Sequence, residues 1–204
     1  MSYFNPPSGW NPLLARIPLA PPAPPKRNVF ISSFHNDRHE VNAFIYHWGT
    51  LQKVFTPKAL CTFDNDDFIN STNPQYVMGQ IREKYLLDST VTIVLIGKCT
   101  HSRRYIDWEI KSSLRRGEYT PNGLIGFLLP SAMPTAHLPE RFSANWNQQQ
   151  NCYARYHTMP ESVATMRRLI EDAFLARTNR AHLIQNDSEM MKNNAVCKVC
   201  RFTH

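Results

Sequence analysis

Apolar runs of strand length alternate with helical patterns along the chain, and this alternation constrains the fold more than any other feature. The runs TVTIVLI at 90–96 and GLIGFLL at 123–129 are continuously apolar, which is typical of parallel strands covered on both faces. Shorter runs at 28–34, 59–63 and 152–157 predict three further strands, the last at a sheet edge. Because parallel strands require crossover helices, the pattern predicts an α/β domain with a flavodoxin-like, doubly wound parallel sheet of about five strands.

The segments between the predicted strands supply the crossover helices. Apolar residues spaced three and four apart draw one stripe after the first strand, another at 74–85 and a third at 158–174. A further helix follows the third strand and contains the segment RRYIDWEI at 103–110. The polar stretch at 131–150 has no such periodicity and predicts a long loop.

The length of 204 residues suits one domain of this kind. We expect the domain at 28–185, a proline-rich extension at 1–27 and a loose tail at 186–204. The run PLLARIPLA is interrupted by Arg16 and Pro18, so no secretory signal is predicted. The longest apolar run is far shorter than a membrane span, and we therefore expect a soluble, cytoplasmic protein without a membrane partner.

Missing motifs and the distribution of charge exclude several classes of function. The net charge is +7, but Lys and Arg are scattered, so an ordinary solvated surface is favoured and nucleic acid is not a predicted partner. The chain lacks GxGxxG, GxxxxGK[ST] and a serine nucleophile elbow, which excludes a Rossmann cofactor cradle, a P-loop and a serine hydrolase. A response-regulator receiver is excluded because Phe34-His35 and Gly97-Lys98 stand where it needs acidic residues.

The five cysteines are an odd number, which favours a reducing compartment over a disulfide framework. Cys197 and Cys200 form one C-x-x-C pair near the end of the sequence. A structural zinc site needs four ligands, and no second pair stands at a suitable spacing. Because Cys152 and His204 would be recruited only by folding the tail back, we predict no metal site.

The segment RRYIDWEI at 103–110 places one carboxylate, Glu109, on the helix that starts where parallel sheets bind ligands. Tyr105 shares its helical face, four residues earlier, and Ile106 and Ile110 mark the adjacent face as the one toward the core. This position leaves two interpretations open. Glu109 is either a catalytic acid or a surface glutamate paired with a neighbouring basic residue.

Four segments resemble the corresponding segments of TIR domains, namely VFISSFHND, FDNDD, VTIVLIGKCTHSRRYIDWEI and NGLIGFLL. They resemble in particular the TIR-like family that includes the NAD-consuming proteins of bacterial Thoeris antiphage defence, over roughly residues 28–180. In TIR domains a W-C-x-x-E stretch opens the third helix, and its Glu is catalytic in members that cleave NAD. Tyr105, Ile106 and Glu109 occupy the Trp, Cys and Glu places, so this sequence departs by having Tyr for Trp.

The resemblance implies an enzyme, an NAD glycohydrolase or cyclase that gives nicotinamide and ADP-ribose or a cyclic ADP-ribose isomer as a defence signal. NAD would be the substrate, no cofactor is implied, and the expected partners are like TIR domains and a downstream effector that senses the product. Glu109 would be the catalytic residue, and Arg103 or Arg104 would hold it ionised or contact the diphosphate. The substrate-binding residues would be Ser33, Phe34, His35, Asp64, Arg103, Arg104 and Tyr105.

Two other functions stay open at this point. Many TIR domains are interaction modules that assemble with like domains and perform no chemistry. A nucleoside deoxyribosyltransferase-like enzyme also uses a Glu on a similar α/β sheet, against an N-glycosidic bond. Turnover of free nucleosides would indicate the second, and assembly without NAD turnover would indicate the first.

Overall fold

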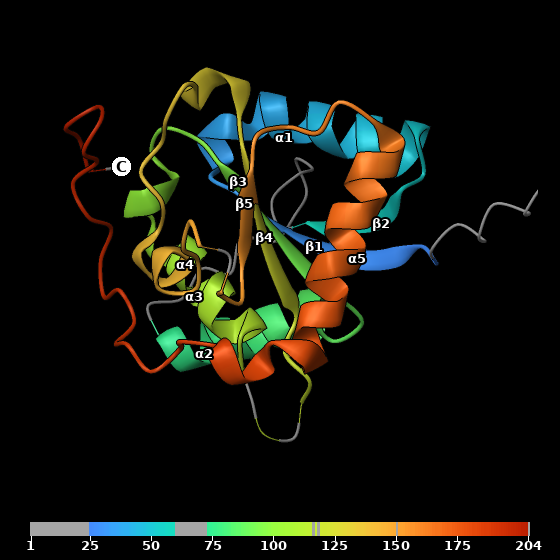
Figure 1. Ribbon diagram of the computed structural model, residues 1–204. Helices are drawn as coiled ribbons and strands as arrows, with labels where there is room; N and C mark the ends of the chain where they lie inside the picture. The colour runs from blue at the N-terminus through green and yellow to red at the C-terminus, as the bar shows by residue number, and fades with distance from the viewer. Residues whose placement is uncertain (1–24, 60–72, 116, 118, 150, 204) are drawn as a thin grey trace, which may run out of the picture.

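A computed structural model describes residues 25–203 of the chain, apart from 60–72, 116, 118 and 150. Its sheet has five strands in the order β2-β1-β3-β4-β5, and every neighbouring pair is parallel. The strands are β1 (Arg27–Ser32), β2 (Phe55–Ala59), β3 (Val91–Ile96), β4 (Gly123–Leu128) and β5 (Arg155–His157). The doubly wound parallel sheet expected from the sequence is therefore confirmed (Figure 1).

Helices cover both faces of the sheet (Figure 1). One face carries α1 (Arg38–Phe44), which continues as π-helical turns at Ile45–Leu51, and α5 (Val163–Asn179). The other face carries α2 (Pro74–Ile81), continued by Arg82–Leu86, together with α3 (Arg104–Ser113) and α4 (Glu140–Ala144). No helix in the described part of the chain has the length and apolar character needed to cross a membrane.

The second strand lies earlier in the chain than the sequence pattern predicts. β2 is Phe55–Ala59, whereas the prediction was 59–63, most of which lies outside the described residues. Pro57 and Lys58 remove the sequence pattern by which this strand would be predicted, because proline donates no hydrogen bond to a ladder and lysine interrupts the apolar run. Pro57 is tolerated within the strand because β2 is an edge strand, paired on one side only, with β1.

The prediction of a long loop at 131–150 is wrong in part, because α4 lies within it. Five residues form no stable helix by propensity alone, so α4 must be held by its tertiary contacts. Phe142 is fully buried against the sheet, and the Arg141 guanidinium donates to the Asp107 carboxylate of α3 at 2.8 Å. Local periodicity does not encode such contacts.

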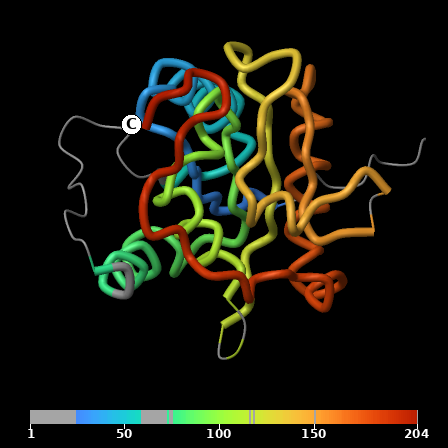
Figure 2. The backbone as a smooth tube through the Cα atoms, turned by 90° about the vertical axis from the view of Figure 1, so that its left-hand side faces the viewer, coloured from blue at the N-terminus to red at the C-terminus, as the bar shows by residue number. Residues whose placement is uncertain are grey.

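The C-terminal segment 186–203, expected to be loose, packs along α3 (Figure 2). The indole Nε1 of Trp108 donates to the Met191 carbonyl oxygen at 2.8 Å, and the backbone N–H of Arg104 donates to Asn194 Oδ1 at 2.9 Å. These bonds satisfy polar groups of an α3 side chain and of the first turn of α3. The segment is irregular in secondary structure but forms part of the packed domain.

Gly123, at the start of β4, lets the backbone of α5 lie directly against the strand, because a Cβ there would collide with the Ala173 carbonyl oxygen. Gly123→Ala is expected to lower the free energy of unfolding by about 3 kcal/mol, since backbone cannot move aside as a side chain can. Urea unfolding measures this. The matched control is Gly79→Ala on α2, where a Cβ meets nothing within 4 Å. Equal midpoints for the two variants would contradict the expectation.

Candidate active site around Glu109

The site begins where β1 ends and α3 passes it. Ile106 and Ile110 anchor one face of α3 among apolar residues of β3 and β4, and Trp108 packs on Phe30 and α2. Glu109 lies between these anchors, only 6% exposed. Its carboxylate Oε2 accepts a hydrogen bond of 2.5 Å from the Ser32 hydroxyl at the end of β1.

Burial raises the pKa of Glu109 from 4.5 to about 8, and the hydrogen bond from Ser32 opposes that rise. The carboxyl is therefore largely protonated at neutral pH in the absence of ligand. This corrects two expectations. Glu109 is not a surface glutamate, and Arg103 or Arg104 does not hold it ionised, because an ionised carboxylate beside a cation has a lowered pKa.

Arg103 and Phe34, both predicted to bind substrate, are in contact with one another. The Arg103 guanidinium lies 4.6 Å from the centroid of the Phe34 ring, and both side chains are buried. Arg103 also donates to the Cys99 carbonyl oxygen at 3.2 Å and to Ser102 Oγ at 2.7 Å. These contacts join the loop after β1 to the loop after β3 at the carboxyl edge of the sheet.

The other predicted binding residues lie in two places, beside Phe34 and beside Trp108, and one of them lies outside the described residues. His35 is exposed and its ring packs edge-on against Phe34, while the neighbouring Ser33 is half-buried. Arg104 and Tyr105 lie beside Trp108, with the Arg104 guanidinium 5.1 Å from the Tyr105 ring and 5.3 Å from the indole. They therefore lie on the side of α3 that the C-terminal segment covers. Asp64 lies outside the described residues.

Comparison with known proteins decides the family. The family model described as Thoeris protein ThsB, TIR-like domain, matches residues 30–132, about half of the chain. The chain belongs to this family. The matched span includes Ser32 and Glu109, and it ends before α4 and α5. No curated protein matches the chain.

Two polar residues at this edge of the ThsB-type domain were not predicted as site residues from the sequence. Ser32 follows Phe30 by two positions, and alternate residues of a strand face the same side, so its direction toward α3 follows from strand parity. Asp37 lies against the loop after β3, where a Cβ on Gly97 would collide with its carboxylate. Burial, then repulsion from Glu40, raises the pKa of Asp37 to about 6. The carboxyl edge thus carries a second acid whose pKa is raised by burial.

A cavity of about 470 Å³ lies at the other end of the sheet in this TIR-like domain. Ser89 and Asn122, which precede β3 and β4, line it together with Arg82 and Arg115. Glu109 is not among its lining residues. Because parallel sheets bind ligands beyond the carboxyl ends of their strands, the position of this cavity does not favour it as the active site.

Proposed function

We propose that this ThsB-type TIR-like domain cleaves the bond between nicotinamide and ribose in NAD, with Glu109 as the catalytic residue. The observation that carries the proposal is the buried Glu109 carboxyl, oriented by Ser32 at the carboxyl edge of the sheet. An ionisable group is costly to bury, so a buried glutamate at the edge where parallel sheets bind ligands is a candidate for chemistry. The family to which the chain belongs acts in Thoeris antiphage defence.

The chemistry needs one well-placed carboxylate and no strong acid. The bond between ribose C1′ and the nicotinamide nitrogen breaks, and nicotinamide leaves as a neutral base with the bonding electron pair. Positive charge then develops on the ribose, and the Glu109 carboxylate stabilises it from a low-dielectric position. Water adds its oxygen to C1′ and releases a proton, giving ADP-ribose, or a nitrogen of the adenine adds instead and closes a cyclic ADP-ribose isomer.

Substrate binding would activate the acid in this scheme. Glu109 is mostly protonated without ligand, because burial raises its pKa to about 8. The nicotinamide ring of NAD is a cation, and a cation within a few ångströms favours the ionised form of a carboxyl. Binding of the intact substrate would therefore release the Glu109 proton to solvent and create the carboxylate that the transition state requires. Glu109 would bind a proton again once the ribose cation has been captured and its charge is gone.

The remaining assignments support the proposal to different degrees. Phe34 and Arg103 are buried against one another at the carboxyl edge of the sheet, and an aromatic ring and a cation would suit a nucleotide's base and diphosphate if ligand binding exposes them. His35 is exposed beside them. The contacts of Arg104 and Tyr105 with Trp108 favour a structural role. We further propose that the product is a defence signal sensed by an effector in the cytoplasm, and that the domain self-associates.

The value of kcat/KM for NAD is expected to rise with pH between about 6 and 9, with a midpoint near the pKa of about 8 that burial gives Glu109. The sign follows because the carboxylate, not the carboxylic acid, is the acting form. The midpoint for kcat should lie lower, since bound nicotinamide favours ionisation. Initial rates of nicotinamide release across this range measure both profiles. A flat kcat/KM would contradict the role given to Glu109.

The proposal is tested by incubating the purified chain with NAD across a series of protein concentrations and separating the products by chromatography. Nicotinamide together with ADP-ribose or its cyclic isomer is the expected result, and the second product peak identifies hydrolase or cyclase. Turnover of free nucleosides with NAD left intact would instead select a deoxyribosyltransferase-like enzyme. Self-association with no loss of NAD at any concentration would select an interaction module.

A further inference from the structure

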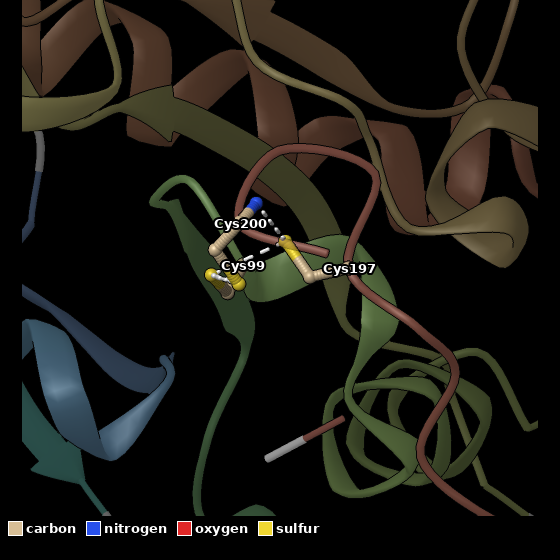
Figure 3. A group of neighbouring side chains, drawn as sticks. All are labelled: Cys99, Cys197 and Cys200. Atoms are coloured by element: carbon tan, nitrogen blue, oxygen red, sulfur yellow. Dashed lines mark hydrogen bonds between the residues drawn. The ribbon is translucent and has the colours of Figure 1, made fainter. Parts of the chain in front are cut away.

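Cys99 meets Cys197 and Cys200, which are distant from it in the sequence, near the carboxyl edge of the sheet (Figure 3). Cys99 lies in the loop between β3 and α3, and Cys197 and Cys200 lie in the C-terminal segment. All three Sγ atoms lie within 4.8 Å of one another, with 3.3 Å from Cys99 to Cys197 and 3.6 Å from Cys99 to Cys200. The C-x-x-C spacing alone does not predict a third thiol here, because packing of the tail brings Cys99 to the pair.

The turn that contains Cys197 and Cys200 is shaped to hold a thiolate. The backbone N–H groups of Val199 and Cys200 point at Cys197 Sγ, with N to S distances of 3.4 and 3.5 Å. Backbone bonds between Cys197 and Phe202 and between Cys197 and Arg201, each 2.9 Å, close the turn around the sulfur. Cys197 is fully buried. Two aimed N–H donors stabilise sulfur as an anion, which is the form that binds metals.

We propose that Cys99, Cys197 and Cys200 bind one zinc ion, which fastens the C-terminal segment to the loop that leads into α3. Thiolates are soft ligands, and zinc is the common divalent ion that accepts several of them in a tetrahedral site. The observed sulfur separations are too long for a disulfide, whose sulfurs lie about 2 Å apart. They are close to the edges of a tetrahedron with zinc to sulfur bonds of about 2.3 Å.

A water molecule is assigned to the fourth place, because no imidazole or carboxylate of the described residues lies within 4.8 Å of all three thiols. His101 supports the site from outside the ligand set. It stands two positions after Cys99, and its Nε2 accepts the backbone N–H of Lys198 at 3.1 Å, inside the C-x-x-C turn. This hydrogen bond holds the turn against the loop that contains Cys99.

The site would act on the segment that positions the catalytic helix. The backbone N–H of Ala195 donates to the Ser102 carbonyl oxygen at 2.9 Å, just before α3 begins. Zinc would therefore fix the tail two residues after this contact and, through the contact, the entry to the helix that carries Glu109. Its role is structural, since the ion would lie in the tail contact and not at the Ser32 hydroxyl.

The test is zinc analysis of the purified full chain after incubation with excess zinc under reducing conditions and removal of loose metal. About one zinc per chain is expected, falling below about a tenth in Cys99→Ser and in Cys197→Ser. Cys152→Ser is the matched control, because Cys152 is buried elsewhere and donates to the Ala154 carbonyl oxygen, and it should retain full zinc. Less than about a tenth of a zinc in the unaltered chain would overturn the proposal.

Cobalt replacement tests the ligands without any variant. The unaltered chain with Co²⁺ is expected to show the intense visible bands of tetrahedral cobalt and a near-ultraviolet thiolate charge-transfer band. A spectrum of hydrated octahedral cobalt would overturn the site. His101→Ala should weaken zinc binding about tenfold in a chelator competition, because it removes the hydrogen bond that supports the C-x-x-C turn, and an unchanged affinity would contradict this supporting role. None of these measurements uses NAD, so their failure is separable from failure of the proposed enzyme activity.

Discussion

Replacing Glu109 with Gln is expected to lower the rate of nicotinamide release from NAD by about 10²- to 10³-fold. Gln keeps the shape of the side chain and can still accept the hydrogen bond that the Ser32 hydroxyl donates to Glu109. It carries no negative charge, so it cannot stabilise the positive ribose of the transition state. The loss corresponds to about 3 to 4 kcal/mol of transition-state stabilisation. Initial rates at saturating NAD, for both proteins at equal concentration, measure it.

The same variant should be no less stable than the unaltered chain. Burial raises the folded-state pKa of Glu109 to about 8, above its ordinary value of 4.5. Between these values the folded protein binds more protons than the unfolded chain, so the free energy of unfolding falls as pH rises through that window. Gln removes this dependence, and Glu109→Gln should gain stability relative to the unaltered chain as pH rises from about 5 to 8.

The control for Glu109→Gln is Glu140→Gln on α4, an exposed glutamate at the surface of the same domain. It should change neither the rate of nicotinamide release nor the pH dependence of the free energy of unfolding. Urea unfolding at several pH values measures the second property for all three proteins. A full rate in Glu109→Gln, with its fold intact, would remove Glu109 from the mechanism.

Replacing Arg141 with Met is expected to lower the free energy of unfolding by about 3 to 5 kcal/mol. Arg141 is 1% exposed, and its guanidinium donates to the buried Asp107 carboxylate at 2.8 Å. It also donates to the carbonyl oxygens of Ser188 and Glu189 in the C-terminal segment, at 3.1 and 3.0 Å. Removing it leaves a buried carboxylate without its cation and breaks the junction of α3, α4 and the tail.

The matched control is Arg180→Met, which removes a more exposed guanidinium from Asp172. It should cost about 1 kcal/mol or less, since solvent screens the pair and Asp172 keeps Arg155 at 3.2 Å. Urea unfolding compares the two variants. Adding Asp107→Asn to Arg141→Met should restore part of the loss, because the unpaired charge is then gone. Equal midpoints for the two single variants would show that the Asp107 pair is unimportant.

The elements that could be predicted from the sequence are those whose pattern is local. β3 and β4 are continuous apolar runs covered on both faces, and Ile106 and Ile110 fix the buried side of α3. What escaped prediction depends on contacts across the chain. α4 exists through the pairing of Arg141 with Asp107, and Cys99 meets Cys197 only after the tail has packed. Periodicity carries no information about such pairings.

The candidate site divides in the same way. Glu109 was found from a motif resemblance, whereas its burial and raised pKa depend on how α3 lies over the end of β1. The direction of Ser32 could have been predicted, because alternate residues of a strand face the same side and Phe30 faces α3. The position of Arg104 beside Trp108 could not be predicted in this way, because it follows from the packing of the C-terminal segment. The motif identifies the candidate group, and the tertiary structure sets its protonation.

The central claim is that NAD is cleaved at Glu109, and the most direct test is a crystal structure of the Glu109→Gln variant with intact NAD. The slow variant should hold the substrate long enough to be seen. The expected result places C1′ of the nicotinamide ribose against the side chain at position 109, near Ser32 and the loop after β1. NAD bound instead in the cavity between Arg82 and Arg115, at the amino end of the strands, would contradict the account.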